Sequence, residues 1–249
     1  TMIFVDDELT SGKTMLNILN VLKQRYPWTG KRLLAGAVIN RMDGEEWARF
    51  GEAGLEPVCL FHIPKEDYSA QIEGIEGSDN CFHDEMEALE KRELPTVEMV
   101  DGRAEPRLCL PIESYRQACE ALYETVRQGA PTNGNGPILL LGTEECMYPA
   151  LVAGAMLERE GYAVRCHATT RSPILVSEAA GYPVYNGSVL RSLYQPDRTT
   201  YIYDMAGYAQ VVVITDAERP ADLGVETLTA ALRRYGNRNI RLLAWRGQP

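Results

Sequence analysis

The chain has 249 residues, of which 45% are hydrophobic and 24% charged, as in a water-soluble globular protein of one or two domains. Its net charge of −10 argues against a nucleic-acid-binding surface, because phosphate backbones are held mainly by clustered lysine and arginine. No apolar run approaches the roughly 20 residues of a membrane helix, and the N-terminus lacks the pattern of a signal sequence. The cysteines form no CxxC pair, so we expect reduced thiols in a cytoplasmic protein.

The first predicted element is an apolar strand at residues 3–5, at whose end stand two adjacent carboxylates, Asp6 and Asp7. A turn then leads into an amphipathic helix, and it consists of Thr10, Ser11, Gly12, Lys13 and Thr14. The turn and the helix N-terminus offer unpaired backbone N–H groups to an anion. The two carboxylates can accept hydrogen bonds from a vicinal diol. Together these features predict a site for a ribose 5-phosphate.

Two alternatives exist for this segment. A nucleoside-triphosphate P-loop requires glycine five positions before the triplet Gly12-Lys13-Thr14, and this chain has Asp7 there. A carboxylate at that place would repel a polyphosphate, so we reject the P-loop. The second alternative is a chance Asp-Asp turn between an ordinary strand and helix.

The next elements continue a strand and helix alternation. We expect a strand over Arg32–Ile39, a short helix over Glu45–Phe50 with Trp47 and Phe50 facing inward, and a buried strand over Pro57–Ile63. This order indicates the remainder of a doubly wound parallel sheet. His62, at the end of the last strand, is interpreted as a satisfied core residue rather than a metal ligand.

Residues 64–106 are rich in acidic side chains and show little periodicity, which favours disorder or an extended crossover. The tract Cys81–Glu85 resembles a metal-binding set, but we interpret it as the solvated start of a helix. Pro95–Val100 is predicted to be a strand that enters a second domain.

The second half contains a further β-α-β unit. Its predicted elements are a helix over 114–128, a loop over 129–137, a strand over 138–141, a helix over 148–160 and a strand over 163–168. A right-handed crossover would place the loops 142–149 and 169–173 at the same carboxyl edge of the sheet. Strands at 201–203, 211–214 and 240–245 and a helix at 224–235 complete a second α/β domain.

Polar side chains in those two loops make a second candidate site. Arg171 can bind a phosphate or carboxylate, and Glu144 with Tyr148 can bind polar groups of a product or partner. The hydroxyl donors are Thr143, Thr169, Thr170 and Ser172. The alternative is that the Thr-Arg-Ser-Pro segment caps a following helix and that Arg171 pairs with a neighbouring acid.

The segment from Ile3 to Thr14 resembles the ribose-binding signature of type I phosphoribosyltransferases, in which an acidic pair precedes a hydroxyl- and glycine-rich loop. Glu8 and Lys13 depart from that pattern without removing a binding group. The resemblance implies 5-phosphoribosyl 1-pyrophosphate as substrate and Mg²⁺ as cofactor. It also implies that Asp6 and Asp7 hold the ribose hydroxyls, directly or through Mg²⁺, with Asp7 a candidate proton acceptor.

A second resemblance lies in His167–Ile174, which contains the Thr-Arg-Ser-Pro string of the TRSP domain, and in Leu141–Pro149, which is similar to a strand-end loop of that domain. The TRSP domain is the C-terminal partner of one phosphoribosyltransferase subfamily, the PRTase_2-like proteins. Members of that subfamily are predicted to act in bacterial biosynthetic clusters linked to tellurite stress, where they make a nucleoside-like product.

These observations predict an α/β fold with two domains. Residues 1–98 would be the C-terminal half of a phosphoribosyltransferase-type parallel sheet, and residues 99–249 a Rossmann-like, TRSP-like domain. Because the chain opens just before the ribose-binding strand, we expect an N-terminally truncated protein or a possible homo-oligomer. We then expect the fragment by itself to be inactive.

The expected function is pentosyl transfer from 5-phosphoribosyl 1-pyrophosphate, a small-molecule substrate, to a nitrogenous acceptor, without nucleic-acid or membrane partners. The alternative is a ribose-phosphate-binding sensor without catalysis. A tandem kinase that makes the pyrophosphorylated sugar ranks last, because Asp216 has no second acidic-pair loop beside it.

Overall fold

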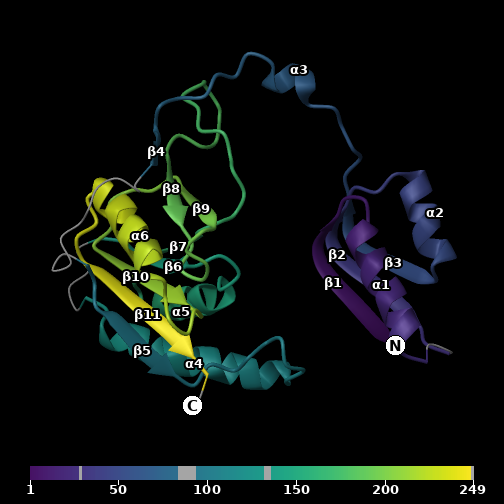
Figure 1. The fold of residues 1–249 in the computed structure, drawn as a ribbon, viewed down its shortest axis with the longest axis horizontal. Helices are drawn as coiled ribbons and strands as arrows, with labels where there is room; N and C mark the ends of the chain where they lie inside the picture. The colour runs from purple at the N-terminus through teal and green to yellow at the C-terminus, as the bar shows by residue number, and fades with distance from the viewer. Residues whose placement is uncertain (28–29, 84–93, 132–135, 248–249) are drawn as a thin grey trace. The chain divides into compact units, whose positions relative to one another are not determined.

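The computed structural model describes residues 1–27, 30–83, 94–131 and 136–247, and the chain forms two compact units, Thr1–Gly74 and Ile75–Pro249. Figure 1 shows the elements of both units in chain order. The sequence placed a boundary at residue 98, whereas the units divide after Gly74. The reason is that β4 (Cys81–His83) pairs with β8 (Gly187–Arg191) far downstream, which ties residues after 74 to the second unit.

The first unit is a three-stranded parallel sheet with helices between the strands, as the sequence predicted. The sheet order is β1-β2-β3, and Val5 lies opposite Gly36, which lies opposite Val58. Its elements are β1 (Met2–Leu9), α1 (Lys13–Arg25), β2 (Leu33–Asn40), α2 (Gly44–Glu52), β3 (Leu55–His62) and the single turn α3 (Ser69–Ile72).

Only one face of this sheet is buried within the unit. A core cluster of Leu19, Phe50, Ala35 and their neighbours fills the space between the strands and α1 and α2. On the opposite face apolar side chains lie in the open, and Val5 is 80% and Leu60 75% exposed. Parallel sheets are ordinarily covered on both faces. The first unit therefore exposes a broad apolar surface.

Two local expectations for the first half, those for Trp47 and His62, need correction. Trp47 does not face inward, since it is 43% exposed, whereas Phe50 is fully buried as expected. In α2 the inward position beside Phe50 is Glu46, which closes a capping box with Asp43 and pairs with Lys65. His62 is exposed rather than in the core, although its Nδ1 lies 3.0 Å from Nδ2 of the buried Asn40.

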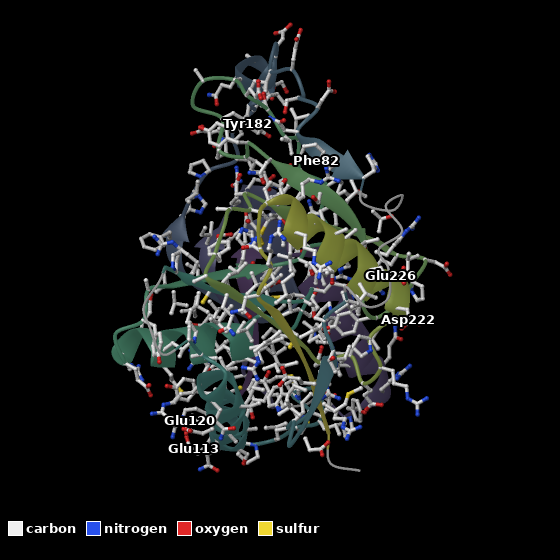
Figure 2. The ribbon with its side chains drawn as sticks, turned by 90° about the vertical axis from the view of Figure 1, so that its left-hand side faces the viewer. Phe82, Glu113, Glu120, Tyr182, Asp222 and Glu226 are labelled. Carbon is white, nitrogen blue, oxygen red and sulfur yellow. The ribbon has the colours of Figure 1, made fainter. Side chains whose placement is uncertain are left out.

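The tract Cys81–Glu85 also differs from the expectation, because its first three residues form strand β4 instead of a helix start. Phe82 in this strand lies under the guanidinium of Arg234, 4.4 Å from the ring centroid, and Figure 2 shows Phe82 among the side chains of the second unit. Residues 84–93, which include the rest of the tract and part of the acid-rich region, lie outside the described residues.

The second unit is built on a five-stranded parallel sheet with the order β5-β11-β10-β6-β7. A small sheet, β4-β8-β9, packs beside it. The elements of the unit after β4 are β5 (Val97–Asp101), α4 (Ile112–Gln128), β6 (Ile138–Gly142), α5 (Tyr148–Arg159), β7 (Val164–Ala168), β8, β9 (Thr199–Tyr203), β10 (Gln210–Thr215), α6 (Asp222–Arg234) and β11 (Ile240–Arg246).

Both faces of the central strands are covered. On one face Leu140 packs with residues of α4 and α5, and on the other Leu139 and Leu141 pack with α6 and the β8–β9 hairpin. The α/β class predicted from the sequence is thus present. Strand β8 has no counterpart among the elements predicted from the sequence. In addition, residues 169–186 contain no helix, so the Thr-Arg-Ser-Pro segment does not cap one.

The order of the strands creates a switch point between β6 and β10. From β6 the chain crosses one face through α5 to β7, whereas from β10 it crosses the other face through α6 to β11. The loops that follow these two strands therefore diverge at the carboxyl edge of the sheet. Crevices of this kind are where open α/β sheets bind ligands. None of the helices in the described residues is long and apolar enough to cross a bilayer.

A bidentate ion pair at the other end of the sheet gives a pH-dependent prediction. Arg241 Nε and Nη2 donate to the two carboxylate oxygens of Glu98 at 3.0 and 2.8 Å, and this bonding, against partial burial, lowers the pKa of Glu98 below its ordinary 4.5. A lowered folded pKa stabilises the protein above pH 4.5, and that stabilisation is lost as the pH falls through the folded value.

We expect Glu98→Gln to lower the free energy of unfolding by up to about 1 kcal/mol at neutral pH, because the pair is partly exposed. The difference should shrink as the pH falls from 4.5 through the lower folded pKa of Glu98, where the wild-type carboxylate also takes up a proton. Urea unfolding of both proteins at neutral and acidic pH measures this. A difference that is the same at both pH values would show that the ion pair is not its cause.

Candidate functional sites at the sheet edges

In the first unit the predicted acidic pair lies on the surface. Asp6 and Asp7 are both exposed, and the Oδ1 atom of each accepts a hydrogen bond from the next backbone N–H, at 3.1 and 2.9 Å. Strand β1 continues to Leu9, so the pair stands within the strand rather than after it. The carboxylates are nevertheless open to a ligand.

The turn after β1 is shaped by Gly12. This residue is the N-cap of α1, with φ +66°, and a Cβ atom added to it would lie 2.0 Å from Cε2 of the buried Phe50. No side chain caps the helix. Among the described residues no acceptor pairs with the backbone N–H groups of residues 11–14, and the first helical bond runs from Leu16 N–H to the Gly12 carbonyl. These N–H groups are free for an anion.

A shallow pocket adjoins this turn. Its lining residues come from the loop after β2, from α2 and from the end of β3, and they are Met42, Asp43, Gly44, Trp47 and His62. Met42 Sδ lies 3.1 Å from the position that a Gly12 Cβ would take, so the pocket and the turn are neighbours. Within the described residues no group of three or more His, Cys, Asp or Glu is arranged to hold a metal ion.

In the second unit the two predicted loops meet at the carboxyl edge of the sheet. The backbone N–H of Glu144 donates to Thr169 Oγ1 at 2.9 Å, and the N–H of Thr169 donates to the Gly142 carbonyl at 3.1 Å. The parallel pairing of β6 with β7 brings these strand ends together. Loops 142–149 and 169–173 therefore form one surface, as the right-handed crossover predicts.

Glu144 holds this surface together. Its backbone has φ +48°, a conformation that is uncommon for a residue other than glycine, and its side chain is only 4% exposed. Arg198 Nη1 lies 2.6 Å from Oε2, and Ser192 Oγ donates to Oε1. Both carboxylate oxygens are thus occupied within the protein, where they fasten the β8–β9 hairpin to the loop after β6.

Thr143 belongs to a buried hydroxyl network. Its Oγ1 lies 2.9 Å from the hydroxyl of Tyr194, which donates to Asp216 Oδ1 at 2.6 Å. Burial, followed by the bond to the Asp216 carboxylate, raises the pKa of Tyr194. Burial, followed by the charge of Asp216, also raises the pKa of the nearby Cys146 thiol to about 12, so this thiol is an unreactive one.

The remaining predicted side chains of the second unit lie at the surface in separate contacts. Arg171 pairs with the exposed Glu145, which is the pairing that the alternative interpretation foresaw. Thr170 exchanges backbone hydrogen bonds with Tyr201 and accepts the Ser172 N–H at 3.1 Å. Tyr148 stacks on Tyr115 with ring centroids 5.8 Å apart. The structure does not gather these side chains around Thr143.

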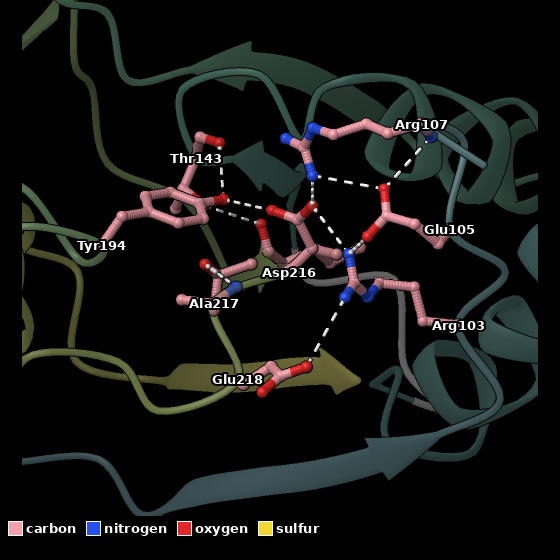
Figure 3. Close-up of polar contacts among 10 residues, drawn as sticks. Arg103, Glu105, Arg107, Thr143, Tyr194, Asp216, Ala217 and Glu218 are labelled. Atoms are coloured by element: carbon pink, nitrogen blue, oxygen red, sulfur yellow. Dashed lines mark hydrogen bonds and ion pairs between the residues drawn. The ribbon is translucent and has the colours of Figure 1, made fainter. Parts of the chain in front are cut away.

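A charged cluster at the same edge was missed by sequence reasoning. We call it the Arg103 cluster, and its members, shown in Figure 3, are Arg103, Glu105, Arg107, Asp216 and Glu218. The loop over residues 102–107 directly follows β5, and Asp216 directly follows β10. Charged residues just after parallel strands are the signal that could have revealed it, because such strand ends meet at one edge.

The comparisons with known proteins identify one family. A family model described as "TRSP domain C terminus to PRTase_2" matches residues 108–232, which include both loops of the second unit and Asp216. Searches of curated proteins and of solved structures gave no match. Because the matching region makes up half of the sequence, the chain belongs to the TRSP domain family.

Proposed function

We propose that this chain acts in phosphoribosyl transfer, with the first unit binding 5-phosphoribosyl 1-pyrophosphate and Mg²⁺. The ribose phosphate would pass to a nitrogenous acceptor in the synthesis of a nucleoside-like product. The observation that carries the proposal is the row of unpaired backbone N–H groups at residues 11–14, which begins four residues after the second of two exposed carboxylates, Asp6 and Asp7. One ligand, a ribose with a 5-phosphate, uses both features.

The family description gives independent support. Its wording refers to a TRSP domain that lies C-terminal to PRTase_2, and in this chain the ribose-phosphate loop precedes the matched residues. The alternation of parallel strands and helices in the first unit is also compatible with part of a phosphoribosyltransferase sheet.

The donors of the first unit fit Mg²⁺ that arrives with the substrate. Magnesium in proteins is commonly held by one or two carboxylates, several waters and the phosphates of the substrate. Asp6 and Asp7 are exposed carboxylates of this kind, and no third protein ligand is needed. When bound, the metal would neutralise charge on the pyrophosphate leaving group.

The chain's own groups would act by position and charge. The N–H groups of residues 11–14 would hold the 5-phosphate, and Asp6 and Asp7 would hold the ribose hydroxyls. The bond between C1 and pyrophosphate breaks as C1 bonds to the acceptor nitrogen, and positive charge develops on the sugar. The carboxylates stabilise that charge, and Asp7 takes the proton that the acceptor nitrogen loses.

Removing both carboxylates tests the site. We expect Asp6→Asn combined with Asp7→Asn to weaken ribose 5-phosphate binding about a hundredfold, since each hydrogen bond to a charged group is worth about 1.5–3 kcal/mol. Calorimetry gives the affinity, and the amide NMR signals of residues 11–14 report the site.

The matched control is Glu45→Gln combined with Glu52→Gln, which removes the same charge from exposed positions of α2. It should bind like the wild type. If the Asp6 and Asp7 variant also keeps the wild-type affinity, the two carboxylates do not bind ribose.

An assay for pyrophosphate release distinguishes an enzyme from the alternative, a ribose-phosphate sensor. An enzyme forms pyrophosphate from 5-phosphoribosyl 1-pyrophosphate in a magnesium-dependent reaction, whereas a sensor binds the sugar without turnover. The assay should be run on this chain and on a version extended upstream of residue 1.

A further inference from the structure

Arg103 has an unusual environment for a buried guanidinium. Its side chain is only 9% exposed, and of its five N–H donors those on Nη1 are engaged, by Glu105 Oε2 at 2.9 Å and Asp216 Oδ2 at 3.3 Å. Nη2 lies 3.9 Å from the exposed Glu218, and no acceptor in the described residues bonds to the buried Nε. Leaving charged donors buried and unpaired costs free energy, so this edge of the guanidinium needs an explanation.

Glu105 lies between two arginines. Its Oε2 contacts Arg103, while Oε1 lies 3.3 Å from Arg107 Nη1 and accepts the Arg107 N–H at 3.1 Å. Burial acts to raise the pKa of Glu105, but this N–H bond and the two guanidinium charges outweigh it and lower the pKa. The carboxylate thus remains an anion and bridges two guanidiniums, as a bound oxyanion does.

The cluster also lies where the fold favours a ligand. It stands at the carboxyl edge of the five-stranded sheet, and Asp216 comes from the loop after β10 at the switch point. Figure 3 shows Tyr194 and Thr143 on the other side of Asp216, so hydroxyl groups adjoin the charges. Ligands of open α/β sheets bind in crevices at this place.

We propose that the Arg103 cluster binds the phosphate group of a small phosphate monoester, which displaces the Glu105 carboxylate from between Arg103 and Arg107. A carboxylate ligand would only exchange one monoanion for another. A phosphate monoester brings a second charge and a third oxygen, which can pair with Nη2 of Arg103 beside Nη1. This site is separate from the ribose-phosphate turn of the first unit and does not depend on it.

The proposal predicts that Glu105 competes with the ligand. A carboxylate tethered beside the site has a high effective concentration, so Glu105→Gln should strengthen binding about tenfold. Arg107→Gln changes a side chain that is 66% exposed and should weaken binding about tenfold without unfolding the chain. Both effects are changes in a dissociation constant.

The experiment is a titration of the full chain with glycerol 2-phosphate, followed by NMR of the Nε–H signals of Arg103 and Arg107. These signals belong to the second unit, so a failure of the ribose-phosphate site would leave them unaffected. Succinate is the control ligand. Glu113→Gln is the control variant, because Glu113 also pairs with an arginine, Arg116, on the exposed side of α4 (Figure 2).

We expect glycerol 2-phosphate to shift the Nε–H signals of Arg103 and Arg107 in a saturable way. Glu105→Gln should bind it more tightly than the wild type, and Glu113→Gln should bind it with the wild-type affinity. The proposal is overturned if wild type and Glu105→Gln both lack a saturable shift. It is also overturned if Glu105→Gln and Glu113→Gln bind glycerol 2-phosphate more tightly than the wild type by the same factor. The same conclusion follows if succinate shifts the two Nε–H signals as strongly as glycerol 2-phosphate does. Should Glu105→Gln fold poorly, the comparison of wild type with Arg107→Gln carries the test.

Discussion

Replacing Gly12 by alanine is expected to destabilise the first unit by about 2–4 kcal/mol and to abolish the ribose 5-phosphate binding that we propose for it. Gly12 has φ +66°, which costs an L-residue about 1 kcal/mol or more, and its Cβ position lies 2.0 Å from Phe50. Overpacking a core side chain adds about 1–3 kcal/mol. Relief of the clash would move the turn and its N–H groups. Urea unfolding and calorimetry measure the two effects.

Gly54→Ala is the matched control for this variant. Gly54 has a similar φ of +78° in the same unit, but nothing lies within 4 Å of its Cβ position. Gly54→Ala should therefore lower the free energy of unfolding only by the backbone conformational cost, about 1 kcal/mol. It should leave the affinity for ribose 5-phosphate unchanged. Equal losses for both variants would show that the contact with Phe50 does not constrain the turn.

The second large effect concerns Arg198, whose removal should lower the stability of the second unit by about 3 kcal/mol. The variant Arg198→Ala leaves the Glu144 carboxylate, 4% exposed, without its cationic partner in the protein. Breaking a buried ion pair by deleting one member typically costs about 3–5 kcal/mol, and the partial exposure of Arg198 places this case at the lower end. Urea unfolding measures the change.

The double variant Glu144→Gln with Arg198→Met shows whether the stability loss of Arg198→Ala comes from an unpaired buried charge or from lost packing. It removes both charges, so much of the stability should return. Arg116→Ala is the control, because Arg116 pairs with Glu113 and Glu120 on the exposed surface of α4, where such pairs are worth at most about 1 kcal/mol. An unrecovered double variant would point to packing instead of charge.

Local sequence patterns predicted much of this fold. The apolar strand before Asp6, the helix after Gly12 and the β-α-β unit around loop 142–149 each depend on neighbouring residues, and all are present. The right-handed crossover then sufficed to place Thr169 beside Glu144. These predictions used periodicity and one rule of chain topology.

Distant pairings could not be predicted in this way. Strand β4 has three residues, and its partner β8 follows about a hundred residues later, so no local signal specifies either one. The Arg103 cluster likewise joins residues 113 positions apart in the sequence. The left-handed backbone of Glu144 is also set by its partners, Arg198 and Ser192, rather than by its sequence neighbours.

The half-covered sheet of the first unit has a thermodynamic consequence. The first unit is small and buries only one face of its sheet, so it gains little stability from the hydrophobic effect. The second unit buries both faces of β6 and β10. On heating, the first unit should thus melt before the second. A ligand that binds only its folded form would raise that early midpoint by mass action, so the lower transition can test the ribose 5-phosphate binding proposed for the turn after β1.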